Sequence, residues 1–142
     1  MLQVKHLLAD KGDQIYTIGA DEPVLAAIRT MADRYVGALL VMRGDELVGI
    51  VSERDYARKI ILKGRASGDT PVRDIMTSPV ITIGPADTVE TCMRLCTDSR
   101  VRHLPVVENG KVVGVVSIGD LVKAVISEQG AQIEQLQRYI AG

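Results

Sequence analysis

The sequence predicts an α+β protein made of two β-α-β-β-α repeats that pack around a pseudo-twofold axis. Two observations predict this fold. Residues 17–61 align with residues 82–126 without a gap at an offset of 65, and fifteen of the 45 aligned pairs are identical. Each copy also contains an apolar run that follows a glycine and leads into Ser-x-x-Asp, which is typical of a buried strand entering a helix. Self-similarity of this length indicates one supersecondary unit used twice.

Length and composition bound the class of protein. With 142 residues, of which 46% are apolar, the chain can bury one core, and that core consists of Ile, Val, Leu and Met because there is no Phe or Trp. A net charge of −1 argues against a nucleic-acid partner. No apolar run is long enough to span a membrane, and the first six residues lack the apolar core of a signal peptide. We therefore expect a cytoplasmic protein that binds neither nucleic acid nor membrane.

The elements follow from hydrophobic spacing and turn residues. Acidic residues and Pro23 open a helix whose apolar side chains recur at helical spacing, and Asn109-Gly110 marks a hairpin turn. In the first copy we expect a helical turn at 4–8, a strand at 15–18, a helix from about 21 to 34, strands at 38–42 and 47–51, and a helix at 53–62. In the second copy we expect a helical turn at 72–76, strands at 104–107 and 112–116, and a helix at 118–128.

The remaining segments divide the chain. Residues 63–71 are polar, contain glycine and end in proline, which favours a linker. After Gly130 a last helix carries Ile133, Leu136 and Ile140 on one face. The predicted organisation is repeat 1 at 4–62, linker at 63–71, repeat 2 at 72–128 and C-terminal helix at 129–142.

Nothing in the sequence indicates catalysis or a metal centre. No Cys–His or Ser–His pairing with a third orienting group and no metal-ligand spacing can be found. Cys92 and Cys96 lie four apart in a helical stretch, where they cannot easily form a disulfide and are too few for a structural zinc site. We interpret both as small core residues, and we expect no enzyme activity, no metal and no required cofactor.

The repeated Ser-x-x-Asp motif has two interpretations. A strand that enters a helix leaves free backbone N–H groups, which suit an anion, but Ser52 and Asp55 could equally form a capping box. Two features favour a ligand: the motif recurs as Ser117 and Asp120, and basic residues lie near each copy. These basic residues are Arg54 and Arg58 in the first copy and Arg102 and His103 in the second.

The duplicated unit resembles the CBS domain family, small regulatory modules named after cystathionine β-synthase. The resemblance covers residues 4–128 and rests on Leu/Pro-Val-Val followed by Gly-hydrophobic-hydrophobic-Ser-x-x-Asp, in two copies in register, the second preceded by Met76-Thr77. It implies a stand-alone tandem CBS protein of the bacterial type that acts in signal transduction. It also implies a homodimer formed through the helices, with a protein target that the sequence does not identify.

The resemblance further implies clefts between the repeats that bind adenosine ligands such as AMP, ADP, ATP, NAD-like dinucleotides or S-adenosylmethionine. The motif Asp would bind the ribose diol, and the motif Ser would lie by the phosphate. One cleft would use Ile50, Ser52, Arg54 and Asp55 with Thr77, Ile81 and Val101. The other would use Val115, Ser117 and Asp120 with Tyr16 and Val36, and Arg102 and His103 would contact phosphate. The alternative is a nucleotide-free scaffold that binds proteins through its helices.

The two predicted clefts differ in sequence. Arg102-His103 aligns with Gly37-Ala38, and Leu40 replaces the proline that the family usually has and that Pro105 retains. His103 is equally compatible with a ligand contact and with a partly buried polar residue at a strand start. Tyr16 is equally compatible with stacking on a purine and with covering the core.

Overall fold

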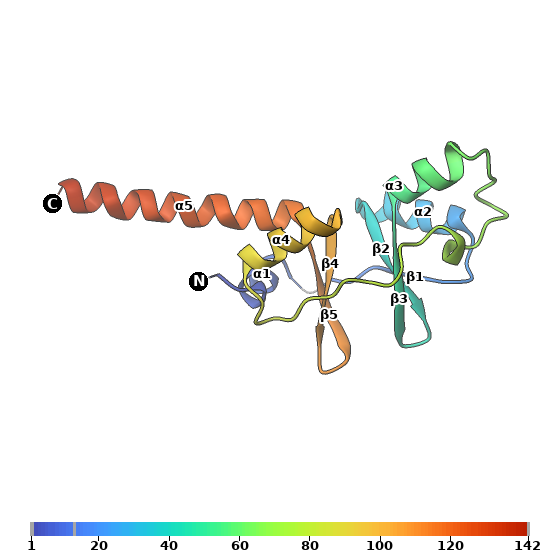
Figure 1. The fold of residues 1–142 in the computed structure, drawn as a ribbon, viewed down its shortest axis with the longest axis horizontal. Coiled ribbons are helices and arrows are strands. Elements are labelled where there is room, and N and C mark those ends of the chain that lie inside the picture. Colours follow the sequence, from blue (N-terminus) through green and yellow to red (C-terminus); the bar gives the residue numbers. More distant parts are fainter. Residues whose placement is uncertain (1, 13, 142) are drawn as a thin grey trace. The chain divides into compact units, whose positions relative to one another are not determined.

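The computed structural model describes residues 2–12 and 14–141, and these form helices and two small sheets (Figure 1). The order is α1 (Val4–Lys11), β1 (Thr17–Gly19), α2 (Val24–Arg34), β2 (Ala38–Arg43), β3 (Glu46–Ser52), α3 (Glu53–Tyr56), the π-helix η1 (Ala57–Ile61), the 3-10 helix η2 (Val72–Asp74), α4 (Val89–Ser99), β4 (His103–Glu108), β5 (Lys111–Ser117) and α5 (Ile118–Ala141). The α+β class predicted from the sequence is confirmed. No helix among these residues is long and apolar enough to cross a membrane.

The chain folds into two compact units. The first-repeat unit is Ile15–Ile81, and the second-repeat unit combines Met1–Gln14 with Thr82–Gly142. We call the short helical turn that precedes each predicted repeat its leading segment. Each unit contains the strands and helices of one repeat but not the leading segment that precedes that repeat in the sequence. The leading helix of the chain, α1, belongs to the second-repeat unit, and η2 belongs to the first-repeat unit.

In the first-repeat unit a three-stranded sheet carries the core. Strand β1 is parallel to β2, and β2 is antiparallel to β3. Apolar side chains of β2 and β3 form one core cluster with those of α2 and of the segment around η2, so that Leu39, Val51 and Ile75 are almost completely buried. The end of α2 near Arg34 agrees with the prediction, and Tyr35 follows it in the left-handed conformation at φ 55°.

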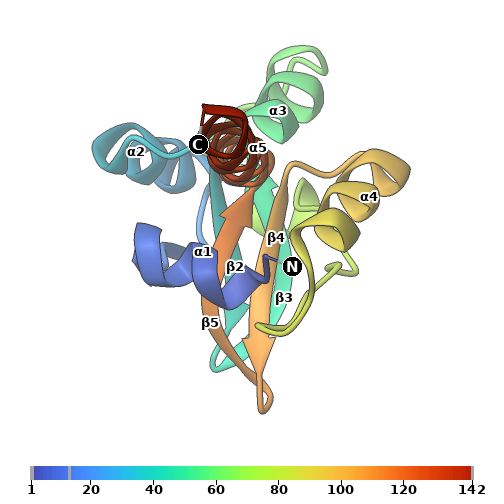
Figure 2. The same ribbon diagram turned by 90° about the vertical axis from the view of Figure 1, so that its left-hand side faces the viewer.

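In the second-repeat unit β4 and β5 form a hairpin with the same register. Val106 pairs with Gly114 as Val41 pairs with Gly49, and Ile83 bridges Val106 in parallel, much as Ile18 in β1 pairs with Val41. Figure 2 looks along α5 and shows α1 beside β5 and α4 beside β4, with α5 above the hairpin. Matching registers in two hairpins agree with the duplication found in the sequence.

In each unit the leading segment packs on the strand that ends in the Ser-x-x-Asp motif, which is β3 or β5 and is called the motif strand below. The residue that makes this contact occupies the same position in both leading segments. A Cβ built on Gly114 would lie 2.6 Å from Leu8 Cδ2, and one built on Gly49 would lie 2.5 Å from Met76 Sδ. Leu8 and Met76 are the equivalent residues of the two predicted helical turns. Both strands therefore need glycine, because the leading segment lies against the strand where a side chain would stand.

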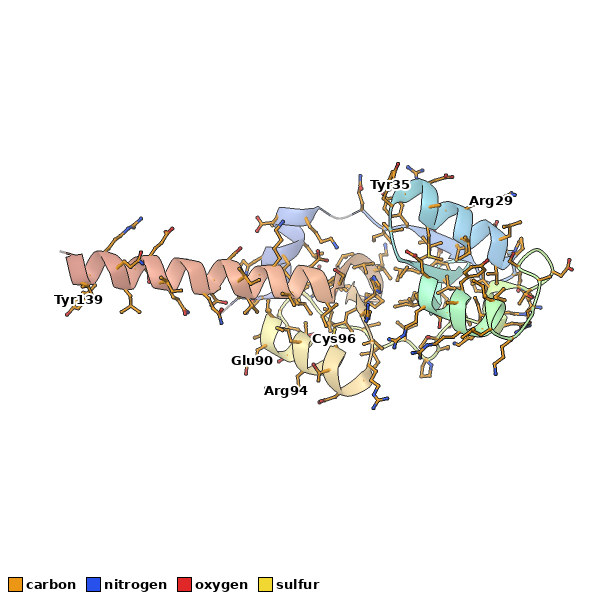
Figure 3. All side chains as sticks on the ribbon, turned by 90° about the horizontal axis from the view of Figure 1, so that it is seen from above. Arg29, Tyr35, Glu90, Arg94, Cys96 and Tyr139 are labelled. Atoms are coloured by element: carbon orange, nitrogen blue, oxygen red, sulfur yellow. The ribbon has the colours of Figure 1, made fainter. Side chains whose placement is uncertain are left out.

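The predicted break at Gly130 is wrong, because α5 runs without interruption from Ile118 to Ala141. A single glycine costs a helix about 1 kcal/mol, and neighbouring Glu, Gln and Ala residues, which are good helix formers, offset that cost. Every described side chain from Ile126 to Ile140 is exposed. Figure 3 shows Tyr139 near the free end of this helix.

Candidate ligand-binding site

The first motif forms a capping box around Asp55. Oδ2 of Asp55 accepts hydrogen bonds from Ser52 N at 3.0 Å and from Ser52 Oγ at 3.1 Å, while Asp55 N donates to Ser52 Oγ at 3.1 Å. Oδ1 lies 3.1 Å from Lys59 Nζ and 3.5 Å from Thr77 Oγ1. Both oxygens of this carboxylate therefore have partners within the first-repeat unit.

The second motif repeats the box around Asp120 with a different cation. Ser117 N donates to Asp120 Oδ2 at 2.8 Å, and Asp120 N donates to Ser117 Oγ at 3.1 Å. The same Oδ2 lies 2.6 Å from Nζ of Lys11, which also donates to the carbonyl of Val115 at 2.8 Å. Oδ1 of Asp120 accepts no hydrogen bond from the residues that the structure describes. The contacts that name an atom of this carboxylate therefore all fall on Oδ2.

The capping interpretation is thus confirmed for both motifs. It does not exclude a ligand at Asp120, because the cap and Lys11 both use Oδ2. A carboxylate has about four lone-pair positions, so a second set of donors can approach Oδ1. Ligand binding at the motifs stays a prediction.

The electrostatics of the second motif favour an ionised carboxylate at Asp120. Burial alone would raise the pKa of Asp120, but hydrogen bonds from Lys11 and Ser117 outweigh burial and lower that pKa below 3.8. Burial, together with the charges of Lys11 and Arg102, lowers the pKa of His103 below 6.5, although Asp120 acts in the opposite direction. Lys11, Arg102, His103 and Asp120 therefore form one electrostatic cluster.

The backbone places Arg102 and His103 beside the second motif. His103 pairs with Ser117 across the hairpin, and the carbonyl of Arg102 accepts a hydrogen bond from Ile118 N at 2.9 Å. Val101 is half-buried and donates its N–H to Cys96 at the end of α4, at 3.2 Å. Arg102 and His103 therefore lie beside the second motif, and their predicted contact with a phosphate stays a prediction.

In the first-repeat unit the structure places Thr77 beside the motif, with Oγ1 3.5 Å from Asp55 Oδ1. Its backbone exchanges two hydrogen bonds with Ile50, at 2.8 and 3.1 Å, which holds it beside strand β3. Arg54 is exposed, as is Arg58, and neither makes an ion pair with the described residues. Ile81 is half-buried. These positions leave two cationic side chains near the first motif available to an anion.

Tyr16 and Val36 also lie in the first-repeat unit. The carbonyl of Tyr16 accepts a hydrogen bond from Leu40 N at 3.1 Å, and Arg34 lies 5.5 Å from the centre of the Tyr16 ring, a cation–π arrangement. Val36 is half-buried just after α2. The predicted pairing of Tyr16 and Val36 with Asp120, and of Val101 with Asp55, stays a prediction.

The sequence did not lead us to the two lysines that pair with the motif carboxylates, Lys59 and Lys11. Lys59 lies four residues after Asp55, a spacing at which an ion pair on one helix face is expected. Lys11 gives no such signal, because 109 residues separate it from Asp120. Only the fold reveals that partner.

The cysteines occupy core positions. Cys92 and Cys96 are free thiols buried on the inner face of α4, whereas Glu90 and Arg94 form an ion pair on its outer face (Figure 3). Burial raises the pKa of Cys92 to about 11 and also raises that of Cys96. Both therefore stay protonated at neutral pH, and the interpretation as core residues is confirmed.

Comparisons with known proteins agree with the duplication. The family model for the CBS domain matches residues 6–62 and again residues 72–127. The chain is 45% identical over 127 residues to the CBS domain-containing protein CBSX3, mitochondrial, of Arabidopsis thaliana, covering 86% of this chain and 62% of CBSX3. It therefore spans less than two thirds of that relative.

Two solved structures share the fold. The crystal structure of the CBS domain NE2398 has a TM-score of 0.85 at 50% identity, covering 89% of this chain and 99% of that chain. The CBS domain pair of MJ0100, in complex with 5-methylthioadenosine and S-adenosyl-L-methionine, has a TM-score of 0.79 at 22% identity, covering 90% of this chain and 98% of that one. The second likeness concerns the fold alone.

Proposed function

The chain belongs to the CBS domain family, and we propose that it is a regulatory protein that binds adenosine nucleotides at its Ser-x-x-Asp motifs. CBS pairs are regulatory modules that often bind adenosine ligands, and MJ0100 is an example. The ligand is AMP or a related nucleotide such as ADP, ATP or NAD. Its binding regulates a partner protein, without catalysis by this chain.

The observation that carries this proposal is the carboxylate of Asp120. Its Oδ1 has no donor among the described residues, and it lies in a cluster with Lys11, Arg102 and His103. A carboxylate can accept hydrogen bonds from both hydroxyls of a ribose, and neighbouring cations attract a phosphate. This set of groups suits a phosphorylated ribonucleoside better than an uncharged or purely apolar ligand.

A second candidate function is a nucleotide-free interaction scaffold. The exposed apolar side chains of α5, among them Ile133, Leu136 and Ile140, favour this alternative because such surface commonly binds protein. The two functions are compatible in one molecule, but only the first requires a ligand at Asp120.

Thermal unfolding with a panel of adenosine ligands tests the proposal. A ligand at 100 times its Kd should add about 2.7 kcal/mol to the free energy of unfolding. Adenosine, AMP, ADP, ATP, NAD and 2′-deoxyadenosine monophosphate form the panel, and mass spectrometry of molecules released from denatured protein identifies a copurified ligand. If no member raises the melting temperature, the scaffold function replaces this proposal.

Substitution of the motif carboxylates separates ligand binding from capping. Asp120→Ala should weaken AMP binding at its site by about 1.5–3 kcal/mol, the usual contribution of a hydrogen bond to a charged group. Asp55→Ala is the matched variant in the other repeat and should weaken AMP binding at the Asp55 site in the same way. If the carboxylates bind ribose hydroxyls, the wild type should bind 2′-deoxyadenosine monophosphate poorly. Titration calorimetry measures both variants. If both bind AMP as the wild type does while melting at lower temperature, the carboxylates only cap their helices.

A further inference from the structure

We propose that Lys11 selects phosphorylated ligands at Asp120. When ribose hydroxyls bind Oδ1 of Asp120, the Lys11 ammonium turns from Oδ2 of that carboxylate to the ligand phosphate. The site then favours adenosine 5′-phosphates over uncharged nucleosides. This inference rests on the proposed function and specifies the ligand chemistry of one of its two motifs.

The contacts of Lys11 place its charge at the motif itself. Nζ lies 2.6 Å from Asp120 Oδ2 and 2.8 Å from the carbonyl oxygen of Val115, and both residues are predicted to contact the ligand. The pair is not sealed from solvent, because the side chains of Lys11 and Asp120 are 38% and 28% exposed. A ligand that approaches Asp120 therefore meets the ammonium group at hydrogen-bonding distance from the carboxylate.

Lys11 has room to change partners. It is the last residue of α1. A cavity of about 570 Å³ lies between α1 and the first turns of α5, and Lys11 and Asp120 both line it. A lysine ammonium is a mobile point charge on a flexible four-carbon stem, so it can follow an anion within its reach.

The exchange of partners explains selectivity. Arg102 already supplies a second cation to this cluster, so an ammonium that turns from Asp120 without a new anion loses its ion pair and gains no other. A ligand phosphate supplies that anion, whereas adenosine does not. Only a phosphorylated ligand gains an ion pair with Lys11, so the ammonium strengthens AMP binding more than adenosine binding.

Lys59 provides the internal comparison. It pairs with Asp55 at 3.1 Å but comes from the same helical segment, four residues on, and also donates to the carbonyl of Ile75 at 2.8 Å. Oδ1 of Asp55 also accepts a hydrogen bond from Thr77 Oγ1 at 3.5 Å, so both oxygens of this carboxylate have donors even without Lys59. The inference therefore concerns the Asp120 motif and not its counterpart.

Titration of AMP and adenosine into Lys11→Met tests the inference, in an Asp55→Ala background that confines binding to the Asp120 site. Met retains the length of the side chain and removes its charge. We expect AMP affinity to fall about tenfold while adenosine affinity stays unchanged or rises, so the preference for AMP over adenosine shrinks at least tenfold. Lys11→Arg should retain most of the preference because it keeps the charge. Lys5→Met, on the same helix and with no ion pair to the described residues, is the control and should change neither affinity.

The outcomes are distinguishable. Equal losses for AMP and adenosine in Lys11→Met would overturn the inference, because Lys11 would then support the fold or the carboxylate alone. Loss of the preference in Lys5→Met as well would also overturn it, since overall charge would be the cause. If the wild type binds neither AMP nor adenosine, the proposed function itself fails. A wild type that binds both equally leaves the proposed function intact and refutes the role of Lys11.

Discussion

Asp55 and Asp120 occupy the same place in their repeats, and the two carboxylates have different surroundings. Both cap a helix through the preceding serine, and both lie beside a lysine. The lysine of Asp55 comes from the next turn of the same helical segment, whereas the lysine of Asp120 comes from α1. The Asp55 side chain is 12% exposed and that of Asp120 is 28% exposed.

This difference teaches that a repeated motif fixes the backbone but not the chemistry of its side chains. The capping bonds lie within four residues, so they follow from the local sequence in both copies. The cation and the remaining donors depend on which segment packs against the motif strand. Both oxygens of Asp55 have partners, whereas the contacts of Asp120 with described residues fall on Oδ2.

The largest expected difference between the units concerns the motif glycines. In Gly49→Ala the new Cβ would lie 3.1 Å from the backbone oxygen of Thr77 as well as against Met76, whereas in Gly114→Ala the close atoms all belong to the end of the Leu8 side chain. A backbone atom cannot move aside as a side-chain end can. We expect a loss of about 2–3 kcal/mol for Gly49→Ala and of about 1 kcal/mol for Gly114→Ala, from the usual cost of overpacking.

Urea unfolding followed by circular dichroism measures both losses. Gly68→Ala is a suitable control, because a Cβ at Gly68 meets nothing within 4 Å. Equal losses of stability in Gly49→Ala and Gly114→Ala would show that both leading segments move aside equally well for an added methyl group. The two units would then tolerate a side chain on the motif strand to the same extent.

The next difference is a pH dependence confined to the second-repeat unit. Burial lowers the pKa of His103 below 6.5, with contributions from Lys11 and Arg102 that outweigh Asp120. The unfolded chain therefore binds the proton more readily, so stability is complete above about pH 6.5 and falls as the pH drops below that value. In His103→Gln this slope between pH 7 and 5 should be smaller. Ala38 holds the equivalent place in the first repeat and cannot titrate.

Chemical unfolding at several pH values tests this expectation. His6→Gln serves as the control, since His6 is the other histidine of the chain and is exposed. An unchanged slope in His103→Gln would mean that another group causes the acid sensitivity. Asp120 does not interfere in this range, because its pKa is lowered from 3.8.

The smallest expected effect on stability concerns the far end of α5. The equivalent helical segment of the first repeat ends at Ile61, whereas α5 continues to Ala141 with exposed Ile133, Leu136 and Ile140. We propose that the protein is a homodimer and that these side chains add to its interface. Deletion of residues 131–142 should change the free energy of unfolding of the monomer by less than about 0.5 kcal/mol, because exposed positions contribute little. The same deletion should weaken self-association.

Sedimentation of the full chain and of the shortened chain at micromolar concentration measures the association. The full chain should sediment as a dimer and the shortened chain should shift towards monomer. A full chain that is only monomeric refutes the homodimer, and a shortened chain that dimerises equally well would place the interface elsewhere on the helices.

The sequence by itself determined the repeat and most of its elements. The match at an offset of 65, the glycine before each motif and the turn at Asn109-Gly110 depend on interactions within a few residues, so periodicity reveals them. The same locality explains why the four residues from Ser52 to Asp55 are enough to indicate a capping box. The break at Gly130 failed because one glycine costs a helix less than a run of helix formers restores.

The tertiary structure decided which leading segment packs on which motif strand. Residues 4–8 and 72–76 are equivalent in sequence, and nothing local tells either segment which repeat it joins. Packing of Leu8 on Gly114 brings Lys11 to Asp120 across 109 positions of the chain. Contacts of such separation leave no periodic signal in one sequence, because they depend on the path of the whole chain. That is the physical reason why Asp120 and Asp55, identical in motif, could be distinguished only in the folded protein.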